Sequence, residues 1–173
     1  MDEVRIIEIK QSIFEDNDKD AERLRSSLRD KGVFLLNLMS SPGSGKTTTL
    51  TKLIPMIKEK YRVGVMEADI DGDVDAKTIA KTGVKSIQLH TGGMCHLDLV
   101  ILENVGNLVC PAEFDTGAVK NIMILSVPEG DDKPLKYPLI FTVCDAVVIN
   151  KIDVAPYFDF DIEKCKENIK MRN

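Results

Sequence analysis

The sequence predicts an α/β fold in which helices cover both faces of a mostly parallel β-sheet. First, short apolar stretches typical of strands alternate with amphipathic, helix-like stretches along the chain. Second, a Gly- and Ser-rich turn at 41–48 separates one such strand from a helix. Third, a polar turn at 150–153 follows another apolar run. Ligands of parallel sheets bind beyond the carboxyl ends of the strands, where both turns fall.

The helices and strands are predicted from the spacing of apolar residues and from the turn-forming residues between them. Residues 10–31 carry apolar side chains at mostly helical spacing among many charges, which predicts an amphipathic helix. We expect the acidic run at 15–20 to be a solvated face or a helix start. Strands are expected near 33–38, 62–67, 84–89, 99–103, 121–127 and 145–150. Helices are expected near 47–60, 74–82, 134–142 and 160–170.

The turn at 41–48 reads Ser-Pro-Gly-Ser-Gly-Lys-Thr-Thr and predicts a phosphate-binding loop. Small residues let backbone N–H groups surround phosphate oxygens at the positive end of the following helix. Lys46 would contact the β- and γ-phosphates, and the Thr47 hydroxyl would bind Mg²⁺. Ser40 replaces the first glycine of the common pattern, which is feasible unless its φ is positive. The predicted loop contacts are Gly43, Ser44, Gly45, Lys46, Thr47 and Thr48.

The turn at 150–153 reads Asn-Lys-Ile-Asp and predicts a guanine-binding loop formed by Asn150, Lys151 and Asp153. The Asp153 carboxylate can accept hydrogen bonds from N1–H and the exocyclic amine of guanine, a pair of donors that adenine lacks. We therefore expect GTP as the ligand and a P-loop GTPase domain over 33–173, preceded by an N-terminal helical extension over 1–32.

The connection between the strands near His90 and Leu99 is short. Only eight residues separate these strands, whereas parallel neighbours need a crossover of about a dozen or more. Either the two strands are not neighbours, or a helical segment is missing between Leu97 and Leu99. The chain also stops in or just after a helix, so we expect the domain to be incomplete at its C-terminus.

Composition agrees with a compact cytoplasmic enzyme. The chain has 173 residues, 43% of them hydrophobic, which suits one domain with a sizeable core. The net charge of −5 gives no electrostatic reason to expect nucleic acid as a partner. No apolar stretch reaches the roughly 20 residues that span a membrane, so no membrane partner is expected. Four widely spaced cysteines argue against a disulfide framework.

Three long segments show a specific resemblance. Residues 95–98, 103–115 and 129–138 are similar to the nickel-incorporation GTPases of NiFe-hydrogenase maturation, the HypB family. The resemblance covers the chain from about Val33 onward and implies a SIMIBI-like P-loop GTPase. Members normally carry a long helix after the Cys-His-Leu-Asp segment and a further strand with a base-contacting loop at the end. The Cys-rich and His-rich N-terminal stretches of some members are absent here.

The resemblance also assigns carboxylates to the magnesium site. It implies that Asp69 assists Mg²⁺, that Glu103 acts near the magnesium shell, and that the Gly106 N–H senses the γ-phosphate. Lys46, Asp69 and Glu103 are thus the expected catalytic residues. Acidic residues downstream resemble a first switch but could equally form a solvated, helix-capping turn: Asp71, Asp73 and Asp75.

A second metal site is expected at Cys95, His96 and Cys110. Thiolate and imidazole ligands together suit Ni²⁺ or Zn²⁺. On residue type alone a buried cysteine is usually a small hydrophobe, and we interpret Cys144 and Cys165 in that way. The family resemblance implies that Cys95, His96 and Cys110 form a metal site at a GTP-dependent dimer interface. His90 has no assigned role.

Together these expectations describe a GTP-hydrolysing metallochaperone with slow intrinsic turnover. It would form a GTP-dependent homodimer and insert nickel into the precursor of the hydrogenase large subunit, with nickel delivered by an accessory protein. Two alternatives stay open: a related GTPase that serves another nickel enzyme such as urease, and a non-catalytic docking module that binds GTP only as a structural ligand.

Overall fold

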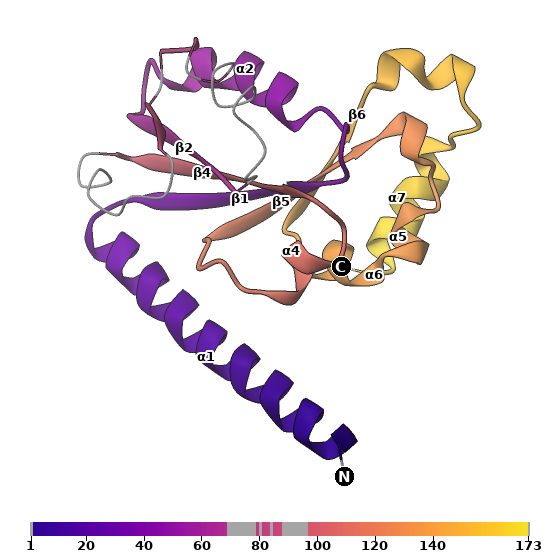
Figure 1. Cartoon of the computed structure of the whole chain (residues 1–173). Helices are drawn as coiled ribbons and strands as arrows, with labels where there is room; N and C mark the ends of the chain where they lie inside the picture. Colours follow the sequence, from indigo (N-terminus) through magenta and orange to yellow (C-terminus); the bar gives the residue numbers. More distant parts are fainter. Residues whose placement is uncertain (1, 69–78, 80, 84, 88–96, 173) are drawn as a thin grey trace.

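Six strands form one sheet in the order β3-β2-β4-β1-β5-β6, and every pair of neighbours is parallel (Figure 1). This computed structural model describes residues 2–68, 79, 81–83, 85–87 and 97–172. The described strands are β1 Phe34–Ser40, β2 Val63–Glu67, β3 Lys85–Ile87, β4 Leu99–Gly106, β5 Lys120–Ser126 and β6 Ala146–Asn150. The predicted α/β fold with a parallel sheet is confirmed.

The described helices flank this sheet. They are α1 Asp2–Asp30, α2 Lys46–Ile57, α4 Cys110–Glu113, α5 Lys133–Lys136, α6 Pro138–Val143 and α7 Ile162–Lys170, with 3₁₀ turns η1 Val127–Glu129 and η2 Ile152–Tyr157. The helix expected at 74–82 lies mostly outside the described residues. The helix expected at 134–142 is two helices, which corrects the prediction. Tyr137 lies between them with φ −126° and ψ 61°, because the ring of Pro138 disfavours helical backbone at the preceding residue.

The short connection after β3 has a topological explanation. β2 lies between β3 and β4 and pairs with both. The strands that end at Ile87 and begin at Leu99 are therefore not neighbours, as the first alternative stated. The second alternative, a helical segment missing between Leu97 and Leu99, stays a prediction. Residues 88–96 of the connection lie outside the described part.

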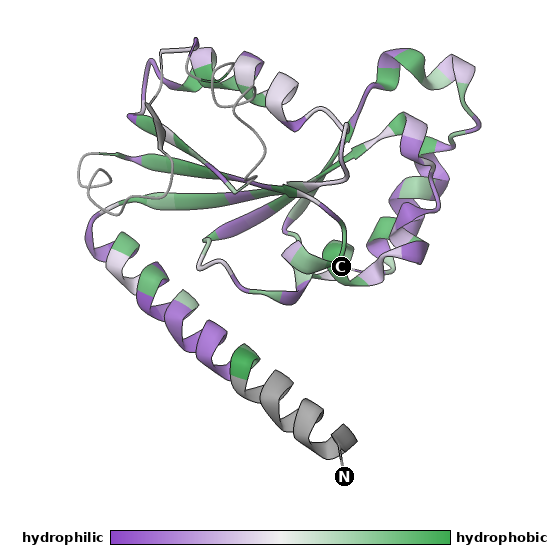
Figure 2. Ribbon diagram, in the orientation of Figure 1, coloured by the Kyte–Doolittle hydropathy of each residue, from purple (hydrophilic) through white to green (hydrophobic). Residues whose placement is uncertain are grey.

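Alternating side chains of the strands fill a separate core on each face of the sheet. Ile122 and Ile124 of β5 pack on the face that carries α2, whereas Met123 and Leu125 pack on the face that carries α6 and α7. Figure 2 shows the hydrophobic residues concentrated in these central strands. Burial of each such side chain stabilises the fold by about 1.5–3 kcal/mol.

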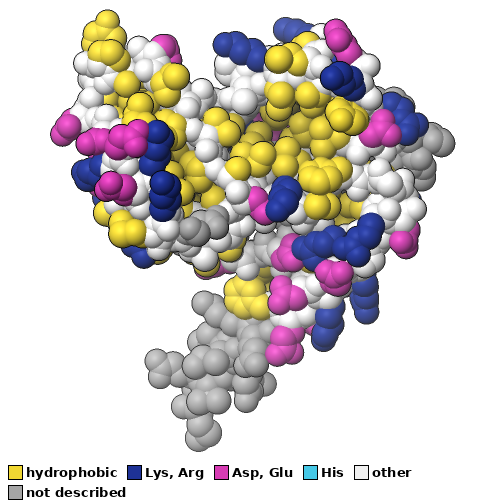
Figure 3. Space-filling view, turned by 180° about the vertical axis from the view of Figure 1, so that it is seen from behind, with side chains coloured by type: hydrophobic (Ala, Val, Ile, Leu, Met, Phe, Trp, Pro, Cys, Tyr) yellow, Lys and Arg dark blue, Asp and Glu magenta, His cyan; other side chains and the backbone are white. Residues whose placement is uncertain are grey.

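The face that carries α2 is not fully covered. Val148 of β6 projects to this side, opposite the buried neighbours on the other face, and is 41% exposed. Leu53 and Met56 of α2 also expose hydrophobic surface. Seen from behind, the molecule has a band of exposed hydrophobic side chains (Figure 3).

Helix α1 lies against the loop that precedes β5. Arg25 donates two hydrogen bonds to the carboxylate of Asp115, at 2.9 and 2.7 Å, and Phe14 stacks on Phe114 with ring centroids 5.3 Å apart. Gly117 has φ +74°, and a Cβ there would lie 2.8 Å from the carbonyl oxygen of Ala21, so this close approach requires glycine. The predicted N-terminal helix is thus present and packs on the sheet domain.

Much of α1 is hydrophilic (Figure 2). Its acidic run at 15–20 is mostly exposed inside the helix, as expected for a solvated face. Among the helices that the structure describes, none combines the length and the apolar character needed to cross a lipid bilayer.

Candidate functional site

A cavity of about 420 Å³ opens at the carboxyl ends of β1, β2 and β4. It is lined by Pro42, Gly43, Gly45, Lys46, Thr47, Thr48, Glu67, Glu103, Asn104, Val105 and Gly106. Most of the predicted phosphate-loop residues therefore lie together with Glu103 and Gly106, which come from a distant part of the sequence. Ser44 does not line the cavity and is buried at 1% exposure.

The loop has the backbone conformation that phosphate binding needs. Gly43 and Gly45 have φ of +70° and +98°, in the region where glycine has no steric cost. Ser40 is not among the described residues with positive φ, so its Cβ is accommodated. Its hydroxyl accepts a hydrogen bond from Lys46 Nζ at 2.8 Å. Helix α2 begins at Lys46 and directs its positive end toward this loop.

Oxygen ligands gather at the edge of the cavity. Thr47 Oγ1 donates to Glu103 Oε1 at 2.8 Å, and the register of the sheet pairs Glu103 with Glu67 of β2. A hydroxyl and carboxylates are the hard oxygen donors that Mg²⁺ prefers. These residues fit a magnesium ion, with Thr47 and Glu103 as the residues that would hold it.

Gly106 approaches the phosphate loop very closely. A Cβ at this position would lie 3.0 Å from Cα of Pro42, so a larger residue would push against the backbone of the phosphate loop. The end of β4 therefore packs directly on the loop.

The predicted base loop contacts the phosphate loop. Asn150 Nδ2 donates to the carbonyl oxygen of Ser44 at 2.9 Å, and Lys151 Nζ donates to that of Gly43 at 2.7 Å. A Cβ on Gly45 would lie 2.6 Å from Asn150 Nδ2. Lys151 has φ 57°, the one positive value among described residues other than glycine. Asp153 is exposed and available to a ligand.

The predicted metal site can be placed only in part. Cys110 is an exposed free thiol at the start of α4, whereas Cys95 and His96 lie outside the described residues. So do Asp69 and His90, and the acidic residues Asp71, Asp73 and Asp75. Within the described ranges, no cluster of three His, Cys, Asp or Glu side chains could hold a metal ion.

The other two described cysteines are structural, as predicted. Cys144 and Cys165 are 2% and 0% exposed in the core beneath α6 and α7. Burial raises the pKa of the Cys165 thiol to about 11, so it stays protonated at neutral pH and is a poor metal ligand.

Sequence reasoning missed Glu67 and Asn104, which both line the cavity. Glu67 stands at the end of an apolar strand, which is a sequence signal for a site residue, but the family resemblance assigned the Mg²⁺ carboxylate to Asp69 instead. The signal for Asn104 was its position between Glu103 and Gly106.

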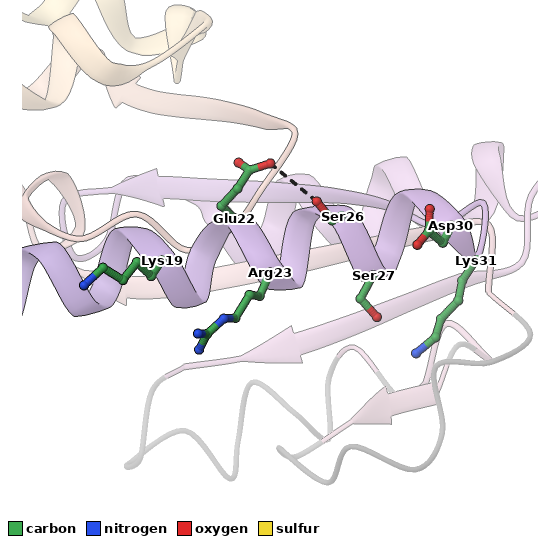
Figure 4. A pocket seen from close by; sticks show the side chains of 7 residues that line it. All are labelled: Lys19, Glu22, Arg23, Ser26, Ser27, Asp30 and Lys31. Carbon is green, nitrogen blue, oxygen red and sulfur yellow. Dashed lines mark hydrogen bonds between the residues drawn. The ribbon is translucent and has the colours of Figure 1, made fainter.

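A larger hollow of about 710 Å³ runs along α1 (Figure 4). All its described lining residues belong to one helix and its end, so it has a single described wall. It offers none of the backbone donors that distinguish the phosphate cavity.

Comparison with known proteins agrees with this geometry. Residues 34–173 match the family described as CobW/HypB/UreG, nucleotide-binding domain. Hydrogenase maturation factor HypB of Azotobacter chroococcum mcd 1 is 45% identical over 93% of this chain and 58% of its own length. The chain therefore spans less than two thirds of that relative. The alignment has 178 positions, more than the 173 residues here, so the relative has residues in the matched region without counterparts in this chain.

Two crystal structures share the fold closely. HypB from Helicobacter pylori in complex with nickel matches with a TM-score of 0.83 and 38% identity, over 91% of this chain and 82% of that one. HypB from Archaeoglobus fulgidus matches with a TM-score of 0.83 and 35% identity, over 91% and 85% of the two chains. With the phosphate cavity and the base loop in place, these matches show that the chain belongs to the HypB proteins of the CobW/HypB/UreG nucleotide-binding family.

Proposed function

We propose that this domain binds GTP with Mg²⁺, hydrolyses it slowly, and serves nickel insertion into NiFe-hydrogenase. The observation that carries the proposal is the contact between the two predicted nucleotide loops. Asn150 and Lys151 bond to carbonyls of the phosphate loop, so one nucleotide can occupy both loops. The relatives named as hydrogenase maturation factors support the biological role.

The residues divide the work of hydrolysis. Lys46 and the first backbone N–H groups of α2 bind and orient the phosphates, and Asp153 selects guanine. Thr47 and Glu103, with Asp69, would hold Mg²⁺, which would neutralise charge on the phosphates when bound. The Gly106 N–H contacts the γ-phosphate and so distinguishes GTP from GDP. No described arginine lines the cavity, which favours slow turnover without a partner.

Nickel or zinc is the cargo in this proposal. Cys95, His96 and Cys110 bind the ion, and a water or the same residues of a second subunit complete the coordination. GTP favours the dimer because it binds the dimer more tightly than GDP does, and hydrolysis then loosens the site. The large-subunit precursor of the hydrogenase and a nickel-delivering protein are the proposed partners. The protein acts in the cytoplasm.

Binding and phosphate release test the nucleotide role. We expect the wild-type chain to bind a fluorescent GTP analogue in preference to ATP and to release phosphate over multiple turnovers. Lys46→Ala should abolish both, because the buried phosphate loses its main positive partner besides Mg²⁺. Lys52→Ala is the matched control, since Lys52 is an exposed lysine on the same helix. Equal affinity for ATP and GTP would overturn the proposal.

Two alternatives have distinct outcomes. A docking module would bind GTP without multiple-turnover phosphate release. A role in urease maturation has some support, because the Helicobacter pylori relative at 40% identity is named a hydrogenase/urease maturation factor. Nickel transfer from this protein to purified apo-hydrogenase and to purified apo-urease, measured separately, shows which of the two enzymes it serves.

A further inference from the structure

Three asparagine side chains form a continuous hydrogen-bonded chain across β4, β1 and β5. Asn104 Nδ2 donates to Asn37 Oδ1 at 3.0 Å, and Asn37 Nδ2 donates to Asn121 Oδ1 at 2.9 Å. At one end, Asn104 Oδ1 accepts the N–H of Val105 at 2.9 Å. At the other end, Asn121 Nδ2 donates to the carbonyl of Val143 at 3.3 Å, where α6 ends.

The two backbone groups at its ends fix the donor-to-acceptor direction of this row of hydrogen bonds. A backbone N–H can only donate and a backbone carbonyl can only accept, so each amide has one orientation that satisfies its neighbours. Asn37 and Asn104 are 1% and 8% exposed, so water cannot readily replace a lost partner. The three hydrogen-bonded asparagines therefore form a rigid polar link through the core rather than a set of interchangeable contacts.

The Asn104 end of this chain lies in an irregularity of the sheet. The register of β1 and β4 shifts between the pairs Leu38–Glu103 and Ser40–Gly106, so that two residues of β4 face one residue of β1. Such a bulge removes a backbone group from the ladder and re-aims the side chains beside it. The side-chain oxygen of Asn104 accepts the N–H of Val105 within the bulge, and this hydrogen bond stabilises the bulge.

We propose that Asn37 and Asn121 are positioning residues for the nucleotide site. By holding the amide of Asn104, they fix the bulge and thereby set the Glu103 carboxylate and the Gly106 N–H at the phosphate cavity. Asn37 does not line that cavity, so it acts on a nucleotide only through its neighbours. This inference rests on the proposed binding of GTP.

The test compares affinities for a non-hydrolysable GTP analogue and for GDP, measured with Mg²⁺ by fluorescence. Asn37→Ala and Asn121→Ala should each reduce the preference for the GTP analogue over GDP about fivefold or more. Asn168→Ala is the control: Asn168 is also buried and donates to a backbone carbonyl, that of Asp131, away from the cavity. It should lower the unfolding temperature and leave the preference unchanged.

The outcomes separate the two proposals. A wild-type preference retained in both asparagine variants overturns the positioning role while GTP binding stands. A wild-type chain that binds no GTP overturns both. If Asn37→Ala does not fold, the partly exposed Asn121 carries the test. A preference that falls equally in Asn168→Ala would show a general effect of stability and would also overturn the role.

Discussion

Thr47 donates a 2.8 Å hydrogen bond to the carboxylate of Glu103, which joins the first turn of α2 to β4. The two residues are 56 positions apart in the sequence. A hydroxyl and a carboxylate that could share a divalent cation are thus already adjacent at the phosphate cavity. In the proposed Mg²⁺ site these two oxygen ligands are thus close together before the nucleotide binds, which lowers the cost of binding.

Removal of this hydroxyl should weaken the dependence on Mg²⁺. In Thr47→Ala, we expect Mg²⁺ to enhance binding of a GTP analogue about tenfold less than in the wild type, because one oxygen ligand is lost. Titration of Mg²⁺ against the fluorescent analogue measures this change. Thr51→Ala is the control, because Thr51 lies on the same helix and bonds only to the carbonyl of Thr48 in the described contacts. An unchanged Mg²⁺ titration would refute the assignment.

The choice of base should depend on Asp153. In Asp153→Asn, the affinity for GTP should fall at least about tenfold, because a hydrogen bond to a charged group contributes about 1.5–3 kcal/mol. Xanthine nucleotides should gain, since the asparagine amide presents a donor to the carbonyl of xanthine. Competition between GTP, XTP and ATP measures both effects. Asp159 is an exposed carboxylate nearby in the sequence and provides the control. Asp159→Asn should leave the relative affinities for GTP, XTP and ATP as they are in the wild type.

Metal binding should couple to association through Cys110. Cys110→Ala and Cys95→Ala should each abolish the proposed Ni²⁺ or Zn²⁺ site. GTP binding should stay largely intact, since neither cysteine belongs to the sequence segments of the phosphate or base loop and Cys110 does not line the phosphate cavity. Metal binding to the wild type should release protons as the thiols ionise. Sedimentation with a GTP analogue, with and without metal, measures the coupling.

Cys165→Ala serves as the control for metal stoichiometry. Its thiol is fully buried and has a raised pKa of about 11, so its removal should not change the number of ions bound. A protein that stays monomeric under every condition would contradict the coupling.

Acid should loosen the attachment of α7 through Asp131. The backbone N–H of Asp161 lowers the pKa of the Asp131 carboxyl; burial opposes this shift, and Lys164 lowers the pKa further. Because the folded pKa lies below the unfolded value of about 3.9, the stabilisation is complete above that pH. It is lost as the pH falls through the folded pKa.

Asp131→Asn tests this dependence. At pH 7 the variant should be less stable by about 1–2 kcal/mol, because the carboxylate is mostly buried and its charged hydrogen bonds are weakened. Below about pH 4 the difference from the wild type should shrink. Urea unfolding across this range gives both numbers. Asp132→Asn, which breaks a more exposed ion pair with Lys136, should change stability by less than about 1 kcal/mol.

Local patterns predicted the fold well because each element has its own signal. The apolar run before the loop at 41–48 and the run before Asn150 are both strands that end at the site. The break at Tyr137 was missed, although Pro138 carries a steric signal for it. The position of β2 between β3 and β4 could not be derived, because strand order depends on packing between distant segments.

The site was predicted where one segment carries the chemistry. Lys46 and Thr47 line the cavity as the loop pattern indicated. The link from Asn104 to Asn37 joins residues 67 positions apart and leaves no local pattern. For the same reason the contact of Lys151 with Gly43 was not expected, since only the folded sheet brings the two loops together.

The separation of β1 and β6 by β5 has a consequence for how the protein is made. The phosphate loop leaves the ribosome before β6, because Asn150 is 106 residues further along than Ser44, which it contacts. A nascent chain that stops before β6 therefore holds a phosphate loop with no base-binding half. In the proposed role GTP contacts both loops, so by mass action it would stabilise the sheet that contains β6 over partly folded states. Guanine nucleotide would then act on newly synthesised chains as a ligand that stabilises the addition of β6 to the sheet.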